Sequence, residues 1–241
     1  MILPSQNDAL HRGWLYRILT AFLDDPLISA NLYFKGGTCA AMLGWLDRFS
    51  IDLDFDFMGN ENDIPIVREK CERLFNSHDL IIDDSSKKVI QYFLKYPAHD
   101  NERNTLKIDT AFPPNSANEY RAFRFPEIDR IAYCQTRETA FANKLVACMD
   151  RKKIAGRDIY DIHHFFLQGF KYSPAVIEAR HEGGILQFFK ELELFVRDSV
   201  TQTSVDQDIN MLLPVKRFQQ VRLHLKQETL MLIRDEIARL K

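Results

Sequence analysis

Three aspartates alternate with apolar residues in the segment "FSIDLDFDF", at positions 52, 54 and 56. This alternation is typical of a β-strand, in which residues two apart point to the same face. Asp52, Asp54 and Asp56 would therefore line one face of a sheet at intervals of roughly 6–7 Å. Carboxylates placed so closely are costly unless a cation lies between them. The pattern predicts a site for a divalent cation.

A pair of glycines precedes these aspartates. Gly36 and Gly37 end a short predicted strand, "NLYFK", and Thr38 begins a predicted helix. Glycine lets the backbone approach a phosphate, the first N–H groups of a helix can bind an anion, and Thr38 can add a hydroxyl. A Gly-Gly pair alone is usually a plain turn. Followed by paired carboxylates, it is typical of an enzyme that binds a magnesium nucleotide.

A third carboxylate, Asp109, lies in the predicted strand "TLKIDTAF". Its apolar neighbours indicate a strand of the same sheet. Three acidic groups from two strands could hold two Mg²⁺ ions about 3.5–4 Å apart, one for a triphosphate and one for an incoming hydroxyl. The alternative is that the acids are the solvated face of an edge strand. The glycines before them and Asp109 after them favour the metal site.

The elements that must position these residues change in character near residue 135. Strands predominate before it, and helices predominate after it. The expected strands are "NLYFK", "FSIDLDFDF", "LIIDD", "KVIQYFLKY", "TLKIDTAF" and "EIDRIAYC". This order predicts an α+β domain followed by a helical bundle.

Composition narrows the class of protein. The 241 residues carry a net charge of −2, which argues against a generally basic nucleic-acid binder but allows a local basic patch. Four scattered cysteines without a CxxC pair argue against zinc. We find no signal-peptide pattern and no apolar run long enough for a membrane span. We therefore expect a cytoplasmic protein that does not contact a membrane.

A second group of charged residues lies in the helical half. Lys144 and Arg151 are seven residues apart with Ala147 and Cys148 between them, so all four share a helix face. The small residues would let this face approach the sheet, and Lys144 could then reach a phosphate as a point charge. We expect Asp158 to orient Lys144 or an arginine, or to help activate the acceptor. The alternative is a solvated, charged helix.

These motifs, taken in order, resemble the AbiEii/AbiGii toxin family of the nucleotidyltransferase superfamily. The resemblance rests on Lys-Gly-Gly-Thr at 35–38, Arg-Phe-Ser-Ile-Asp-Leu-Asp-Phe at 48–55, Asp109, and "NKLVACMDRKKIAGRDIYDIHHF". It implies a nucleotidyltransferase-like mixed sheet with flanking helices over residues 1–135. It also implies a helical domain over residues 136–241 that completes the active-site cleft. At residues 39–41 this chain has Cys-Ala-Ala, whereas an aliphatic residue such as leucine is common in the family soon after the threonine. We interpret this departure as a difference in packing only.

The resemblance also assigns roles to residues. The nucleotide would be bound by Lys35, Gly36, Gly37, Thr38, Arg48, Ser50 and Arg151. The metal ligands would be Asp52, Asp54 and Asp109. The catalytic residues would be these three aspartates together with Lys144 and Asp158. Asp56 falls outside the family's pair, so we expect it to be structural. Family members are silenced by phosphorylation near this motif, which makes Ser50 a hypothetical regulatory site.

The implied reaction is Mg²⁺-dependent transfer of a nucleoside monophosphate from an NTP to an acceptor hydroxyl. The family implies an RNA acceptor, namely the 3′ end of tRNA, a role as the toxin of a toxin–antitoxin system, and a separately encoded antitoxin. Two basic groups could contact RNA phosphates: Arg151, Lys152, Lys153 and Arg157, and Lys216, Arg217, Arg222 and Lys226. A small-molecule acceptor such as an aminoglycoside, or a non-catalytic nucleotide-binding module, are the alternatives.

Overall fold

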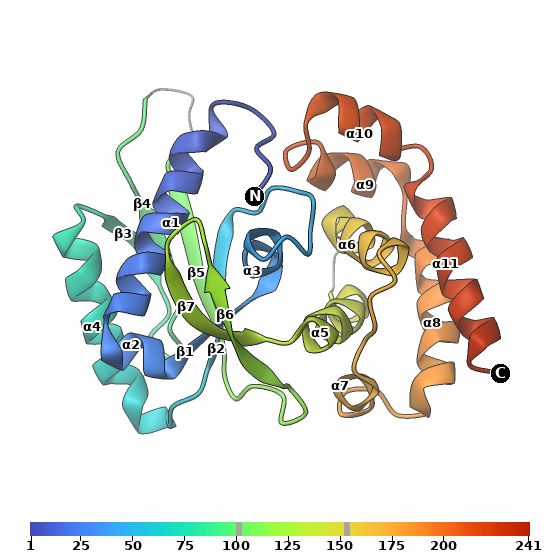
Figure 1. The fold of residues 1–241 in the computed structure, drawn as a ribbon, viewed down its shortest axis with the longest axis horizontal. Helices are drawn as coiled ribbons and strands as arrows, with labels where there is room; N and C mark the ends of the chain where they lie inside the picture. Colours follow the sequence, from blue (N-terminus) through green and yellow to red (C-terminus); the bar gives the residue numbers. More distant parts are fainter. Residues whose placement is uncertain (100–102, 152–154) are drawn as a thin grey trace. The chain divides into compact units, whose positions relative to one another are not determined.

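A computed structural model describes residues 1–99, 103–151 and 155–241, and the chain divides into two compact units. The first unit consists of Met1, Leu3–Pro114 and Tyr120–Gln135, and the second consists of Ile2, Asn115–Glu119 and Thr136–Lys241. The first holds a sheet with flanking helices and the second is helical (Figure 1). The predicted fold class, a mixed sheet followed by helices, is confirmed.

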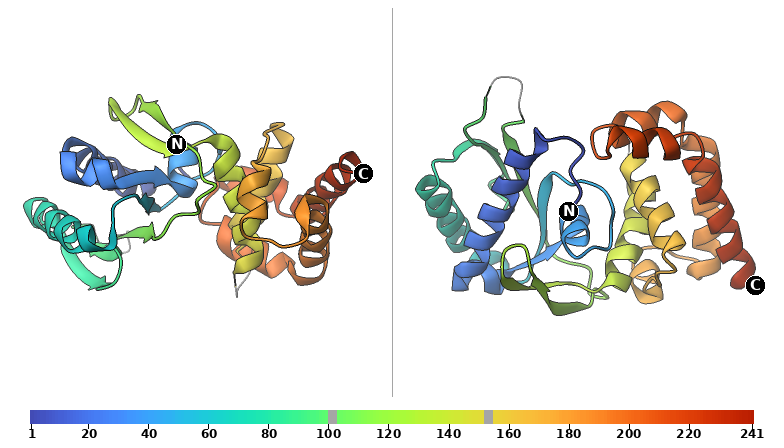
Figure 2. Two further views of the ribbon diagram at one scale, coloured as in Figure 1. Left: turned by 90° about the horizontal axis from the view of Figure 1, so that it is seen from below. Right: turned by 45° about the horizontal axis from the view of Figure 1, so that its top comes forward.

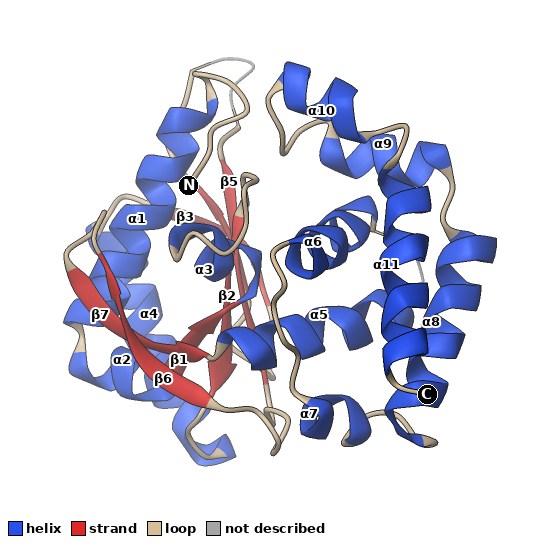
Figure 3. Cartoon of the chain, turned by 45° about the vertical axis from the view of Figure 1, so that its right-hand side comes forward, coloured by secondary structure: helices blue, strands red, loops and turns tan. Residues whose placement is uncertain are grey.

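The first unit is built on one seven-stranded sheet, drawn in red in Figure 3, with strand order β3-β4-β5-β2-β1-β7-β6. β1 runs parallel to β7, β2 runs parallel to β5, and the other neighbours are antiparallel. The strands are β1 (Leu32–Lys35), β2 (Asp52–Phe57), β3 (Ile81–Ser85), β4 (Tyr92–Lys95), β5 (Thr105–Ala111), β6 (Tyr120–Phe125) and β7 (Arg130–Gln135). The aspartate-bearing strand β2 therefore lies inside the sheet, which contradicts the edge-strand alternative.

Alternation along β2 separates the apolar core from the acidic face. Leu53, Phe55 and Phe57 are buried in the core with apolar side chains of the helices on that side. Figures 1 and 2 show α1, α2 and α4 gathered on one side of the sheet. The helices of the first unit are α1 (Asp8–Asp24), α2 (Pro26–Asn31), α3 (Gly36–Met42) and α4 (Ile64–Ser77), with a short 3₁₀ turn, η1 (Glu61–Asp63). Asp52 and Asp54 point away from this core.

Two elements of the first unit were not predicted from the sequence. The helix α2 is short, and Asp25 caps it by accepting hydrogen bonds from the backbone N–H groups of Leu27 and Ile28, with Pro26 in the first turn. The strand β6 is at the edge of the sheet and buries only part of its side chains, so it lacks a continuous apolar pattern.

A buried histidine connects α1 to the start of β2. His11 Nε2 donates to the backbone oxygen of Ile51 at 2.8 Å, and Nδ1 lies 2.7 Å from the hydroxyl of Tyr96. Burial lowers the pKa of His11 from 6.5 to about 4. The ring is therefore neutral in the folded chain near pH 7, and it holds the residue that precedes Asp52.

This histidine predicts a pH dependence of stability. Between pH 6.5 and 4 the unfolded chain binds a proton at His11 that the folded chain does not, so stability falls as the pH decreases through this range. The contribution amounts to about 2 kcal/mol between pH 7.5 and 5. Urea unfolding at both pH values should show a difference about 2 kcal/mol smaller in His11→Gln than in the wild type. Equal pH dependence in the two proteins would contradict this assignment.

The second unit is formed by α5 (Arg137–Asp150), α6 (Gly156–Leu167), α7 (Pro174–Glu178), α8 (Gly184–Ser199), α9 (Gln202–Ile209), α10 (Val215–Val221) and α11 (Leu225–Arg239). α6 is central and contacts α5, α9 and α11, while α8 and α11 run side by side (Figure 2). A Cβ atom at Gly156 would lie 2.7 Å from Val205 Cα, so the glycine permits the close approach of α6 and α9. Within the described parts of the chain, no helix is long and apolar enough to cross a membrane.

Candidate active site

The parallel pairing of β2 with β5 brings the predicted acidic residues together. Asp54 lies directly opposite Asp109, and Asp52 lies directly opposite Lys107. All four side chains share the sheet face that points away from Leu53 and the core. We call these four residues, Asp52, Asp54, Lys107 and Asp109, the carboxylate face.

The glycine turn is packed against this face. Gly36 has a φ of +78°, a conformation that favours glycine, and a Cβ atom there would lie 2.9 Å from Asp54 Cβ. Thr38 Oγ1 donates a hydrogen bond to the backbone oxygen of Asp52. The backbone that begins α3 is therefore held next to both aspartates of β2.

The second glycine, Gly37, contacts the segment that leads into β2. A Cβ atom at this position would lie 2.9 Å from both Arg48 Nη2 and Ser50 Oγ. Arg48 is buried, and its Nη1 donates to the backbone oxygen of Phe49 at 2.8 Å. The structure thus brings Gly37, Arg48 and Ser50 together, as the predicted nucleotide site requires. Ser50 is almost fully buried.

Asp56 has surroundings different from those of the other two aspartates on β2. Lys35 Nζ lies 2.6 Å from its Oδ1, while Tyr120 OH and Gln135 Nε2 donate to its Oδ2 at 2.7 and 2.6 Å. Three donors from three other strands therefore bind this buried carboxylate. Lys35, which the family resemblance assigns to the nucleotide, forms its ion pair with Asp56.

Two residues that sequence reasoning missed hold Asp109. Lys107 Nζ lies 2.5 Å from Oδ2 of Asp109, and Gln91 Nε2 donates to Oδ1 at 3.0 Å. The position of Lys107, two residues before Asp109 in one strand, was a signal that the two share a face. Gln91 precedes β4, and nothing in its local sequence indicates its partner.

The donor chemistry of the carboxylate face fits Mg²⁺, because the ion prefers carboxylate oxygens and the strand register places Asp54 beside Asp109. Among residues 1–99, 103–151 and 155–241, however, no three His, Cys, Asp or Glu side chains are gathered closely enough to hold a metal ion. Asp109 is instead bound by the ammonium of Lys107. The assignment of Asp52, Asp54 and Asp109 as metal ligands stays a prediction.

In the second unit, Lys144 lies between two buried aspartates of α6. Its Nζ is 3.0 Å from Asp158 Oδ1 and 3.0 Å from Asp161 Oδ2. Both carboxylates are completely buried, and the lysine side chain is 16% exposed. Two buried negative charges therefore share one ammonium group. The expected pairing of Asp158 with Lys144 is present.

Arg151 completes this group from beyond the end of α5. Its Nε lies 2.8 Å from Asp158 Oδ2, although the two are not aligned for a hydrogen bond. Burial, and then the charge of Asp158, raise the pKa of the Cys148 thiol to about 12. Cys148 is thus a neutral residue that contributes packing. Asp158 forms ion pairs with two cations, Lys144 and Arg151.

The two basic groups suggested for RNA are partly engaged within the fold. Arg222 pairs with Asp206, and Lys226 Nζ donates to the backbone oxygens of Arg197 and Val200 at 2.8 and 2.7 Å. Lys152 and Lys153 lie outside the described residues. The engaged side chains are less available to phosphates than their sequence suggested.

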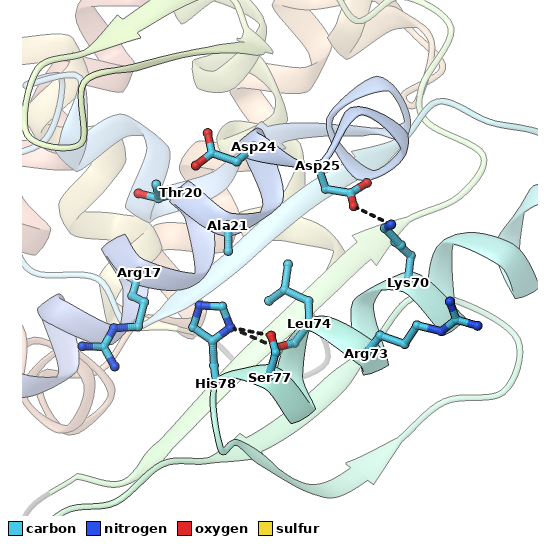
Figure 4. Close-up of a pocket in the computed structure, with 10 residues that line it drawn as sticks. All are labelled: Arg17, Thr20, Ala21, Asp24, Asp25, Lys70, Arg73, Leu74, Ser77 and His78. Atoms are coloured by element: carbon cyan, nitrogen blue, oxygen red, sulfur yellow. Dashed lines mark hydrogen bonds and ion pairs between the residues drawn. The ribbon is translucent and has the colours of Figure 1, made fainter.

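A cavity of about 680 Å³ lies between α1 and α4, on the helical side of the sheet (Figure 4). Its charged groups pair with one another or with neighbours: Lys70 Nζ is 3.1 Å from Asp25, and Arg73 is 2.5 Å from Glu69. His78 Nδ1 lies 3.0 Å from the backbone oxygen of Leu74. This cavity belongs to the face opposite the carboxylates and contributes nothing to their chemistry.

Several solved structures have the same fold as this chain. A protein of Helicobacter pylori described as a candidate nucleotidyltransferase aligns with a TM-score of 0.59 and 20% identity, over 98% of this chain and 99% of that one. JHP933 of Helicobacter pylori aligns with a TM-score of 0.58 and 21% identity, over 99% and 96%. MenT4, a nucleotidyltransferase toxin of Mycobacterium tuberculosis, aligns with a TM-score of 0.53 and 17% identity, over 96% and 88%. The chain has the fold of these three proteins.

The sequence identifies the family of this chain. Residues 17–226 match the model of the AbiEii nucleotidyl transferase toxins of type IV toxin–antitoxin systems. The chain belongs to this family, and the resemblance drawn from the motifs is confirmed. Comparison with the curated proteins gives no match.

Proposed function

We propose that this protein is a Mg²⁺-dependent toxin that transfers a nucleoside monophosphate from an NTP to a hydroxyl of RNA, namely the 3′ end of tRNA. The observation that supports this most directly is the register of β2 with β5, which sets Asp54 beside Asp109. The Gly36 backbone lies against the same aspartate. A phosphate-binding turn beside paired carboxylates suits a triphosphate substrate.

In this proposal each group acts on a different part of the reaction. The backbone of Gly36 and Gly37 and the hydroxyl of Thr38 bind phosphate oxygens, and the carboxylates of Asp52, Asp54 and Asp109 hold Mg²⁺. Bound there, Mg²⁺ would neutralise developing charge on the phosphates. The acceptor hydroxyl attacks the α-phosphorus and pyrophosphate leaves. Positioning and charge neutralisation therefore supply most of the rate enhancement.

The acceptor and the partners in this proposal are those that the family resemblance implies. Members of the family are toxins of type IV systems, so a separately encoded antitoxin is part of the proposal. An enzyme that uses NTP and tRNA would act in the cytoplasm. Ser50 is the proposed phosphorylation site; its side chain is almost fully buried, so a kinase could modify it only after the side chain becomes accessible.

The test incubates the purified protein with Mg²⁺, total tRNA and each α-³²P-labelled NTP in turn. Expected is label in the tRNA band of a denaturing gel with at least one NTP, and no label when EDTA replaces Mg²⁺. If tRNA were still labelled in the presence of EDTA, the proposed dependence of transfer on Mg²⁺ would be wrong. Absence of labelled RNA with all four NTPs would contradict the RNA acceptor, and thin-layer chromatography with aminoglycosides would then test the small-molecule alternative.

A further inference from the structure

Lys107 is the cation that the structure places inside the carboxylate face. Parallel pairing of β2 with β5 sets it directly opposite Asp52, one step along the sheet from the pair formed by Asp54 and Asp109. Neighbouring strands lie about 4.8 Å apart, so three carboxylates and one ammonium occupy adjacent positions on one face. The motifs quoted above for the family resemblance do not include this lysine.

Of the three carboxylates, Lys107 forms its ion pair with Asp109. Its Nζ lies 2.5 Å from Asp109 Oδ2, and Gln91 binds the other oxygen of Asp109. Both Lys107 and Asp109 side chains are 30% exposed, so the pair is only partly screened by water. Asp109 is therefore held by two donors, one from β5 and one from the residue before β4.

Within the described residues, Asp109 already has a cation beside it, and no three His, Cys, Asp or Glu side chains are gathered for a metal ion. A carboxylate that binds an ammonium through one oxygen and an amide through the other has both oxygens engaged. A divalent cation and an ammonium repel each other at a separation of a few ångströms. The two cations therefore compete for Asp109.

The neighbouring strand β4 places an aromatic ring near the ammonium of Lys107. Phe93 of β4 lies directly opposite Lys107 in the antiparallel pair of β4 and β5, and Lys107 Nζ is 5.8 Å from the centre of its ring. An ammonium at that distance is attracted to the face of the ring. A small rotation of the lysine away from Asp109 would thus keep a favourable contact.

We propose that Lys107 is a resident counterion: it neutralises Asp109 while no divalent cation is bound, and the divalent cation displaces it towards Phe93. Lys107 is then a positioning residue that sets the affinity of the carboxylate face for its metal. This inference rests on the proposed function, because it takes the carboxylates as metal ligands. It adds that the apparent metal affinity includes the cost of releasing Lys107.

The test measures Mn²⁺ binding to the full chain without any nucleotide, by electron paramagnetic resonance of free Mn²⁺. Lys107→Met should bind Mn²⁺ about tenfold more tightly than the wild type, because a competing positive charge is gone. Lys107→Arg keeps the charge and should stay within about threefold of the wild type. Lys107→Gln, which can still donate to Asp109 without charge, should also bind more tightly and serves if the methionine variant does not fold.

Lys95→Met is the matched control. Lys95 lies on β4, on the same side of the sheet as Lys107, and forms a lysine–aspartate pair of the same length, 2.5 Å, with Asp83, which is not one of the predicted metal ligands. Its removal should leave the Mn²⁺ affinity unchanged, and Asp54→Asn should abolish the binding that Lys107 controls. Equal or weaker Mn²⁺ binding in both neutral Lys107 variants, or binding that survives Asp54→Asn, would overturn the inference.

The outcome separates this inference from the proposed function. If the neutral variants bind Mn²⁺ with unchanged affinity while the wild type still labels tRNA, the counterion role of Lys107 is wrong and the proposed function stands. Tighter Mn²⁺ binding in the neutral variants, with no transfer from any NTP to any acceptor, counts against the proposed function alone.

Discussion

Replacing Asp54 by asparagine is expected to reduce nucleotidyl transfer by at least about 10³-fold, equivalent to about 4 kcal/mol of transition-state stabilisation. Asp54 lies beside Asp109 and against Gly36, and in the proposed site its carboxylate is the group between the metal and the phosphates. Removing one of several neighbouring negative charges relieves repulsion, so the free energy of unfolding should stay within about 1 kcal/mol of the wild-type value. Labelled-NTP transfer and urea unfolding measure the two effects.

Asp56→Asn is the control for this prediction, because it makes the same chemical change on the same face of the same strand. Asp56 is bound by Lys35, Tyr120 and Gln135, so its substitution should lower the free energy of unfolding by about 1–3 kcal/mol. Transfer per folded molecule should fall by less than tenfold. If Asp56→Asn lost as much transfer as Asp54→Asn at unchanged stability, the distinction between the two aspartates would be wrong.

Replacing Lys144 by methionine is expected to have the largest effect on stability. Lys144 is an ammonium shared by Asp158 and Asp161, both fully buried, and its loss leaves two buried carboxylates without this cation. Breaking a buried ion pair by removing one partner costs about 3–5 kcal/mol. Urea unfolding followed by the circular dichroism of the helices should show this loss. Transfer should be lost as well if Lys144 binds phosphate.

Two further variants separate charge from packing in this group. Lys144→Met combined with Asp161→Asn removes one of the two buried charges and should recover part of the lost stability. Lys190→Met, at an exposed position of α8, should change the free energy of unfolding by less than about 0.5 kcal/mol. If Lys144→Met were within 1 kcal/mol of the wild type, the buried pairs would contribute little to the fold.

Local sequence pattern was sufficient for most of the strands and for the direction of their side chains. The alternation of Asp52, Leu53, Asp54 and Phe55 determines which side chains enter the core, because a strand has a period of two whatever its neighbours are. The order of strands before helices likewise indicated the α+β class. Short elements with partial burial, such as β6 and α2, have too few apolar residues to be found in this way.

What the sequence by itself determined is the set of chemical groups and the face on which each lies: the glycine turn, the acidic strand and the lysine–aspartate pattern of the helical half. The tertiary structure decided which groups meet. Only the pairing of β2 with β5 sets Asp54 beside Asp109 and Lys107 across from Asp52, and only the packing of α5 on α6 buries Asp158 and Asp161 around Lys144. Strand register and helix contact are selected by burial of the whole core, which joins residues far apart in the chain, and no local pattern carries that information.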